Sequence, residues 1–101
     1  MIEPLPHPVI VYVSIGNSDD KLSQEEWAEF TRRIANEVAM FAKTVHGQWY
    51  SLPNSRWQNA CWCLEFTDPG IMREAREALT VAREDFRQDS VAWAVAETEF
   101  I

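Results

Sequence analysis

The sequence predicts a single-domain α+β fold of the ferredoxin-like βαββαβ type, with a four-stranded antiparallel sheet and two helices on one face. Two segments carry apolar residues at three- and four-residue steps, which is typical of amphipathic helices. Four other segments are rich in β-branched and aromatic residues, and the six segments follow one another in the order strand, helix, strand, strand, helix, strand. Right-handed crossovers then give the strand order 4-1-3-2 with antiparallel neighbours.

The first half of the domain begins with the β-branched run at residues 9–15, which predicts a central strand that ends at Gly16. Ser23 and Glu26 have the spacing of a capping box, in which each side chain bonds the other residue's backbone amide. The helix that follows is expected to continue to His46-Gly47, because glycine is a common residue after a helix end. Its apolar stripe is formed by Trp27, Phe30, Ile34, Val38, Phe41 and Val45.

The second half supplies a short strand at 48–51 and a longer strand at 59–66, joined by a turn at 53–55. Asp68 and Pro69 predict the start of the second helix as its cap and first helical residue. The last strand is expected at 90–100, where apolar alternation outweighs the alanine content that would favour a helix. The apolar stripe of the second helix is formed by Met72, Ala75, Leu79, Ala82 and Phe86.

The chain has two expected parts, an extended arm at residues 1–8 with three prolines and one folded domain at residues 9–101. A chain of 101 residues with 47% hydrophobic content is long and apolar enough for one core. The aliphatic side chains of the first strand (Val9, Val11, Val13 and Ile15) are expected to pack under the helices.

The second sheet face is left uncovered by this topology, and the sequence does not decide whether Trp62 and Trp93 point toward it. Aromatic side chains on that face would favour a homodimer formed through the open sheet face.

Three polar loops are expected to meet at one end of the sheet, because the first two strands run opposite to the last two. These loops are residues 16–21, 51–59 and 87–90, and they combine amides, carboxylates, two arginines and an indole. Such groups suit hydrogen-bonded recognition of a polar ligand or peptide, although turns also favour Asn, Asp and Ser for conformational reasons. The candidate binding residues are Asn17, Ser18, Asp19, Asp20, Asn54, Arg56, Trp57, Gln58, Asn59, Arg87, Gln88 and Asp89.

Charge and motifs exclude several function classes. The net charge is −7, from nine basic and sixteen acidic residues, which argues against direct nucleic-acid binding. Cys61 and Cys63 lie two residues apart on a predicted strand and are expected to be buried free thiols rather than a disulfide or zinc site. Asp19-Asp20 lacks the further oxygen ligands that a divalent ion needs. No metal, cofactor or catalytic residue is therefore expected, and no phosphate-binding or nucleophile motif is found.

The expected location is the cytoplasm. Residues 1–8 lack the charged and apolar regions of a signal peptide, and no apolar run is long enough to cross a bilayer. No membrane partner is expected.

Three stretches, VYVSIGNSDDKL at 11–22, WQNACWC at 57–63 and RQDS at 87–90, resemble a group of small uncharacterised proteins from actinobacteria and their phages. The resemblance covers most of the chain. It implies no activity or cofactor, and it adds a phage or defence-related accessory role to the hypotheses.

The sequence thus favours a non-enzymatic binding protein that recognises a partner protein or a small polar ligand through the converging loops. Two alternatives stay open. One is a small dimeric enzyme with a pocket at the open sheet face, and the other is a purely structural dimer module.

Overall fold

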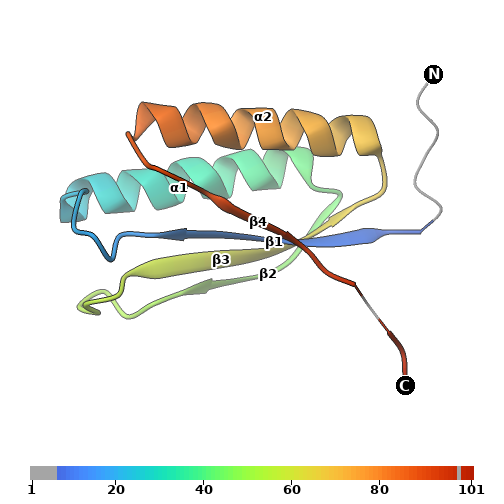
Figure 1. Cartoon of the computed structure of the whole chain (residues 1–101), viewed down its shortest axis with the longest axis horizontal. Coiled ribbons are helices and arrows are strands. Elements are labelled where there is room, and N and C mark those ends of the chain that lie inside the picture. The colour runs from blue at the N-terminus through green and yellow to red at the C-terminus, as the bar shows by residue number, and fades with distance from the viewer. Residues whose placement is uncertain (1–6, 98) are drawn as a thin grey trace.

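The computed structural model describes residues 7–97 and 99–101, so most of the predicted arm at residues 1–8 lies outside the described part of the chain. With the strands numbered along the chain, the sheet has the order 2-3-1-4 with antiparallel neighbours, which is the predicted 4-1-3-2 order in reverse. Both helices lie on one face of the sheet (Figure 1), and the ferredoxin-like prediction is confirmed. The elements are β1 (Val9–Gly16), α1 (Gln24–Phe41), β2 (Thr44–Tyr50), β3 (Asn59–Phe66), α2 (Pro69–Asp85) and β4 (Ala92–Val95).

Helix α1 begins as predicted but ends earlier. Ser23 Oγ accepts a hydrogen bond from the amide of Glu26 at 3.1 Å, and Glu26 Oε1 accepts one from the amide of Ser23 at 3.1 Å. The predicted end at His46-Gly47 is wrong, because the backbone is already extended at Ala42 and the amide of Lys43 donates to the carbonyl of Glu65. Residues 44–47 therefore belong to β2, and Val45 continued the helical spacing of apolar residues only by coincidence.

The observed boundaries of β2 and β4 differ from the predicted ones. β3 matches its predicted range of 59–66, since it is paired on both sides. β2 begins at Thr44 instead of residue 48, and its register against β3 shifts between Val45 and Gly47. β4 covers only 92–95 of the predicted 90–100, and residue 98 of that range lies outside the described part of the chain. Within the described residues β4 pairs only with β1, and the bond from the amide of Ala96 to the carbonyl of Ile10 lies one residue from the start of β1.

The core lies between the sheet and the helices. Val11, Val13 and Ile15 are buried there, as their alternation in β1 predicted. Trp62 also faces the helices and is 0% exposed, and its ring is nearly perpendicular to that of Tyr50 at a centroid distance of 5.7 Å. Both helices contribute buried residues to the core: Phe30, Ile34 and Val38 from α1, and Ala75, Leu79 and Ala82 from α2.

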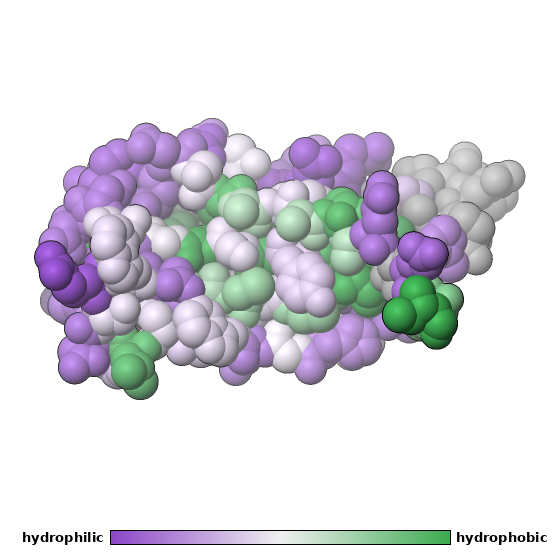
Figure 2. Space-filling view, turned by 60° about the horizontal axis from the view of Figure 1, so that its bottom comes forward, coloured by the Kyte–Doolittle hydropathy of each residue, from purple (hydrophilic) through white to green (hydrophobic). Residues whose placement is uncertain are grey.

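Trp93 likewise packs on the helix side, with its ring 5.7 Å from that of Phe66. The two tryptophans therefore do not supply aromatic surface to the open sheet face. That face instead carries Ile10, Tyr12, Ser14, Trp49, Cys61, Cys63, Glu65, Ala92 and Ala94, as the strand registers show. Figure 2 shows mainly apolar and weakly polar side chains over the sheet, with more hydrophilic side chains toward its edge.

Within the described residues, neither helix is long and apolar enough to cross a membrane.

Truncation of Leu79 to alanine is expected to lower the free energy of unfolding by about 2–5 kcal/mol, because it opens a cavity between α2 and the sheet. Val81→Ala on the exposed side of the same helix is the matched control and is expected to change it by less than about 0.5 kcal/mol. Urea unfolding of both variants measures the difference, and equal effects would contradict the packing described for α2.

Candidate functional site: two hollows beside a tethered loop

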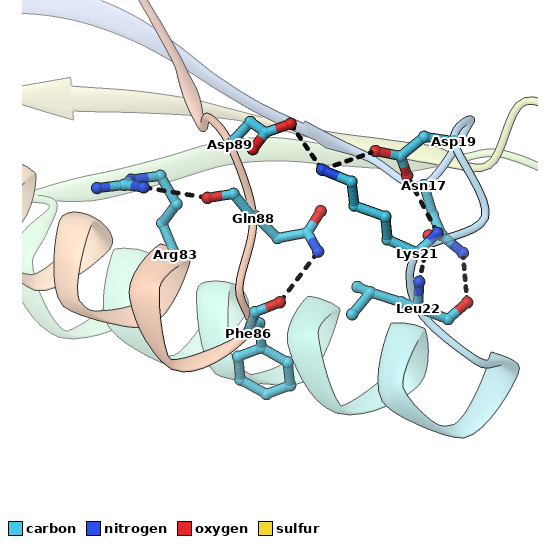
Figure 3. A network of polar contacts seen from close by, with 8 residues as sticks. All are labelled: Asn17, Asp19, Lys21, Leu22, Arg83, Phe86, Gln88 and Asp89. Carbon is cyan, nitrogen blue, oxygen red and sulfur yellow. Dashed lines mark hydrogen bonds and ion pairs between the residues drawn. The ribbon is translucent and has the colours of Figure 1, made fainter.

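The loop after β1 is closed by the side chain of Asn17, which is 1% exposed. Its Oδ1 accepts from the amide of Leu22 at 3.0 Å, and its Nδ2 donates to the carbonyl of Leu22 at 3.0 Å. The same Nδ2 donates to Gln58 Oε1 at 3.1 Å, and the Asn17 amide donates to the Gln58 carbonyl at 2.8 Å. A single buried carboxamide thus closes the loop on itself and attaches it to the β2–β3 hairpin. Figure 3 shows the bonds between Asn17 and Leu22.

Gln58 extends this network to α1. Its Nε2 donates to Gln24 Oε1 at 2.6 Å and to the carbonyl of Pro53 at 3.1 Å. Its Oε1 accepts from Gln24 Nε2 at 3.0 Å as well as from Asn17. Because Gln24 is the first residue of α1, the hairpin, the loop and the helix start are held together.

Ion pairs attach the loop after β1 and the start of α1 to residues 87–90. Lys21 Nζ lies 2.7 Å from Asp89 Oδ2 and 3.8 Å from Asp19 Oδ2 (Figure 3), and Arg87 pairs with Glu26 at 2.8 Å. The hydrogen bond from Lys21 lowers the pKa of Asp89, and the same bond raises the pKa of Lys21. The pair is therefore charged at every pH between the ordinary pKa values of Asp and Lys, about 3.9 and 10.4. It lies at the surface, so salt screens it.

The end of α2 shapes the third loop. The amide of Arg87 donates to the carbonyl of Glu84, and the amide of Gln88 donates to the carbonyl of Arg83. With Arg87 at φ 55°, these bonds form a Schellman motif in which arginine occupies the position usually taken by glycine. Gln88 is buried and donates from Nε2 to the carbonyl of Phe86 at 3.0 Å.

The three predicted loops do lie at one end of the sheet, but they form two hollows on either side of the loop after β1 instead of one rim. The hairpin hollow, of about 570 Å³, lies between that loop and residues 51–59. The smaller hollow, of about 360 Å³, lies between the same loop and residues 87–90. The hairpin hollow is lined by Ser18, Asp20, Gln24, Pro53, Asn54, Ser55, Arg56, Trp57 and Gln58.

The twelve predicted residues fall into three groups. Asn17, Gln58 and Gln88 are buried, and their amides serve internal hydrogen bonds. Asn59 is half-buried and donates from Nδ2 to the carbonyl of Trp57. The exposed remainder is Ser18, Asp19, Asp20, Asn54, Arg56, Trp57, Arg87 and Asp89.

Two residues of this end were missed by the sequence analysis. Gln24 completes the amide network and Lys21 holds Asp89, but neither stands out by spacing. Lys21 is the only lysine or arginine in residues 16–21, next to two aspartates, and this local charge pattern was the one available signal.

The open sheet face carries the remaining reactive groups. Cys61 and Cys63 are free thiols and only half-buried, less enclosed than expected. The hydrogen bond with Cys63 raises the pKa of Tyr12. His46 Nε2 lies 2.9 Å from Glu65 Oε1. In the described part of the chain, no three His, Cys, Asp or Glu side chains come together as metal ligands.

Comparisons with known proteins identify the fold but no family. No protein-family model and no curated protein matches the chain. A de novo designed protein, Foldit4, superposes with a TM-score of 0.63 at 14% identity, over 92% of this chain and 100% of the design. A hypothetical protein from Arabidopsis thaliana, solved in solution, gives 0.60 at 18% identity, over 98% of this chain and 95% of that protein.

A third structure, described as a dimeric ferredoxin-like protein from an uncultured marine organism, gives a TM-score of 0.47 at 10% identity, over 93% and 91% of the two chains. At these identities the likeness extends to the fold alone.

Replacement of Asn17 by alanine is expected to lower the free energy of unfolding by about 3 kcal/mol, because the amide and carbonyl of Leu22 lose their buried partner. Ser18→Ala, at the exposed neighbouring position, is the control and is expected to be nearly neutral. Urea unfolding gives both values. A loss no larger than that of the control would show that Asn17 does not hold the loop.

Proposed function

We propose that this protein is a non-enzymatic binding protein that recognises a partner protein or a small polar ligand through the hairpin hollow. The observation that carries the proposal is Trp57, whose side chain is 68% exposed at the margin of this hollow. Exposed tryptophan costs solubility, whereas at interfaces tryptophan and arginine are enriched among the residues that dominate binding energy.

The backbone of Trp57 is held on both sides although its side chain is exposed. Its amide donates to Ser55 Oγ at 3.1 Å, and its carbonyl accepts from Asn59 Nδ2. The next residue, Gln58, is tied to Asn17 and Gln24. A partner would therefore meet an indole presented from ordered backbone, which reduces the entropy lost on binding.

Arg56 supplies charge beside the indole. It is exposed, and it makes no ion pair with any residue in 7–97 or 99–101. Asp20 and Asn54 add an acceptor and an amide to the same hollow. This combination favours a ligand that offers both hydrogen-bonding groups and a flat or apolar surface.

The cellular setting of the proposal comes from the sequence. Its resemblance to small actinobacterial and actinophage proteins supports a cytoplasmic accessory role in phage infection or defence.

The double variant Arg56→Ala with Trp57→Ala is expected to lose the bound ligand or partner, with affinity reduced at least about tenfold. Native mass spectrometry of protein purified gently from its host detects a small ligand as an added mass, and parallel pull-downs detect a protein partner. Leu52→Ala is the matched control, since Leu52 is exposed on the same hairpin but does not line the hollow.

The double variant should keep the thermal stability of the wild type, because both side chains are exposed. If it retains the same adduct or partner in the same amount, or if Leu52→Ala loses it equally, the hairpin hollow is not the binding site.

The open sheet face favours a second role, self-association into a homodimer. Its central residues, including Tyr12, Ser14, Cys61 and Cys63, carry no formal charge in a chain whose net charge is −7. Two acidic molecules approach most easily where few like charges meet. From strand spacing and rise per residue, the flat area of this four-stranded face is roughly 500 Å², without the added area of its side chains. Typical interfaces bury about 800 Å² per partner. The dimeric-enzyme and structural-module alternatives both require this interface.

Introducing a charge with Tyr12→Glu is expected to convert a wild-type dimer into a folded monomer, because each copy would bury an unpaired carboxylate. Size-exclusion chromatography with light scattering measures the mass, and circular dichroism checks the fold. Met40→Glu on the exposed surface of α1 is the control and should stay dimeric. A monomeric wild type, or a Tyr12→Glu variant that stays dimeric, would exclude dimerisation through this face.

A further inference from the structure

The outer edge of β4 is an unprotected sheet edge. Among residues 7–97 and 99–101, β4 pairs only with β1, and its residues Ala92–Val95 (Ala-Trp-Ala-Val) include no charge and no proline. The opposite edge strand, β2, has a register shift between Val45 and Gly47 that disturbs further pairing. Edge strands normally carry charges, prolines or bulges that block unwanted strand addition, so β4 lacks the usual protection.

The hydrogen-bonding phase of β4 shows which backbone groups face outward. The amide of Ala96 donates to the carbonyl of Ile10 at 2.8 Å, and the register pairs Ala94 with Tyr12 and Ala92 with Ser14. In an antiparallel ladder, hydrogen-bonded and non-hydrogen-bonded pairs alternate. The N–H and C=O groups of Trp93 and Val95 therefore point away from β1, toward the free edge.

A groove of about 410 Å³ runs beside this edge, between α2 and β4. Figure 1 shows β4 beginning near the C-terminal end of α2 and running obliquely away from it, on the viewer's side of the molecule. Arg76, Thr80 and Arg83 line the groove from α2 at helical spacing, and Val91 and Trp93 line it from the other side. We call this site the α2–β4 groove.

The groove brings two arginines together in an acidic protein, one of which, Arg83, also lies 3.5 Å (Nη2) from Glu84 Oε1. Arg76 and Arg83 are two of only nine basic residues, against sixteen acidic ones. The guanidinium of Arg76 lies 5.6 Å from the centroid of the Trp93 ring. It forms no ion pair with the described residues of the chain.

Arg83 is held in place, since its Nη1 donates to the carbonyl of Gln88 at 3.0 Å (Figure 3). Asp89 also lines the groove, but Lys21 holds its carboxylate.

We propose that the β4 edge binds an extended acidic segment of a partner protein by strand addition, with its acidic side chains in the α2–β4 groove. Arg76 and Arg83 are seven residues apart, about 10.5 Å along the helix. Side chains two and four positions apart on one face of an added strand are about 6.6 and 13.2 Å apart, which brackets this distance, and the long arginine side chains span the difference of a few Å. The backbone of Trp93 and Val95 supplies the hydrogen bonds, and the arginines supply the specificity. This site uses the sheet edge opposite to the hairpin hollow and does not depend on that site.

Fluorescence anisotropy with a labelled short peptide in which Glu alternates with Val tests the proposal. This peptide is expected to bind the full chain, and the same peptide with Lys in place of Glu is expected to bind at least about tenfold more weakly. Arg76→Glu should weaken binding of the Glu peptide about tenfold, whereas Arg73→Glu should change it less than about twofold. Arg73 is the matched control because it is exposed on the same helix and does not line the groove.

Strand addition is tested separately from charge. Val95→Pro removes an outward amide without breaking the β1 ladder, and it should abolish binding of the Glu peptide while circular dichroism stays unchanged. The proposal is overturned if the Glu and Lys peptides bind equally, if Arg73→Glu and Arg76→Glu act alike, or if the Glu peptide does not bind. It is also overturned if the wild type is a dimer that Val95→Pro dissociates, since a second copy would then occupy the edge.

Discussion

The buried carboxamide of Asn17 is the interaction on which the end of the sheet with the three polar loops depends. It satisfies both backbone groups of Leu22 and also reaches Gln58 on the hairpin. A buried polar side chain lowers stability unless all its polar groups are hydrogen-bonded. This arrangement is therefore stable only when the loop, the hairpin and the start of α1 hold the relative positions that allow these bonds. The exposed residues around it, Trp57 above all, take their positions from a side chain that no ligand can touch.

The same network divides the polar end of the molecule. The loop after β1 is bonded to the hairpin by amides on one side and to residues 87–90 by the ion pair of Lys21 and Asp89 on the other. Hydrogen bonds between buried side-chain amides are insensitive to salt, whereas salt weakens the surface ion pair of Lys21 and Asp89. The hairpin side is therefore the less salt-sensitive of the two, in agreement with the proposal that the hairpin hollow is the binding site.

Local sequence signals predicted most of the fold because each corresponds to a short-range physical cause. Asp68 and Pro69 marked the start of α2, and alternation identified β3, since capping and strand pleating act over a few residues. The end of α1 was misjudged because Val45 satisfies the period of a helix and the composition of a strand equally well. In the structure the helix ends at Phe41, the backbone is extended at Ala42, and the amide of Lys43 already bonds the carbonyl of the distant Glu65.

The sequence predicted the location of the candidate site but not which of its side chains are buried and which are exposed. By itself the sequence determined the order of elements, the antiparallel topology and hence the end of the sheet where three polar loops lie. Only the tertiary structure decided that Asn17, Gln58 and Gln88 are buried, while Trp57 and Arg56 stay exposed. It also decided that Trp62 and Trp93 face the helices, and that β4 ends at Val95 with an open edge. The physical reason is that propensity acts along the chain, whereas burial and the pairing of polar groups depend on neighbours that are distant in sequence.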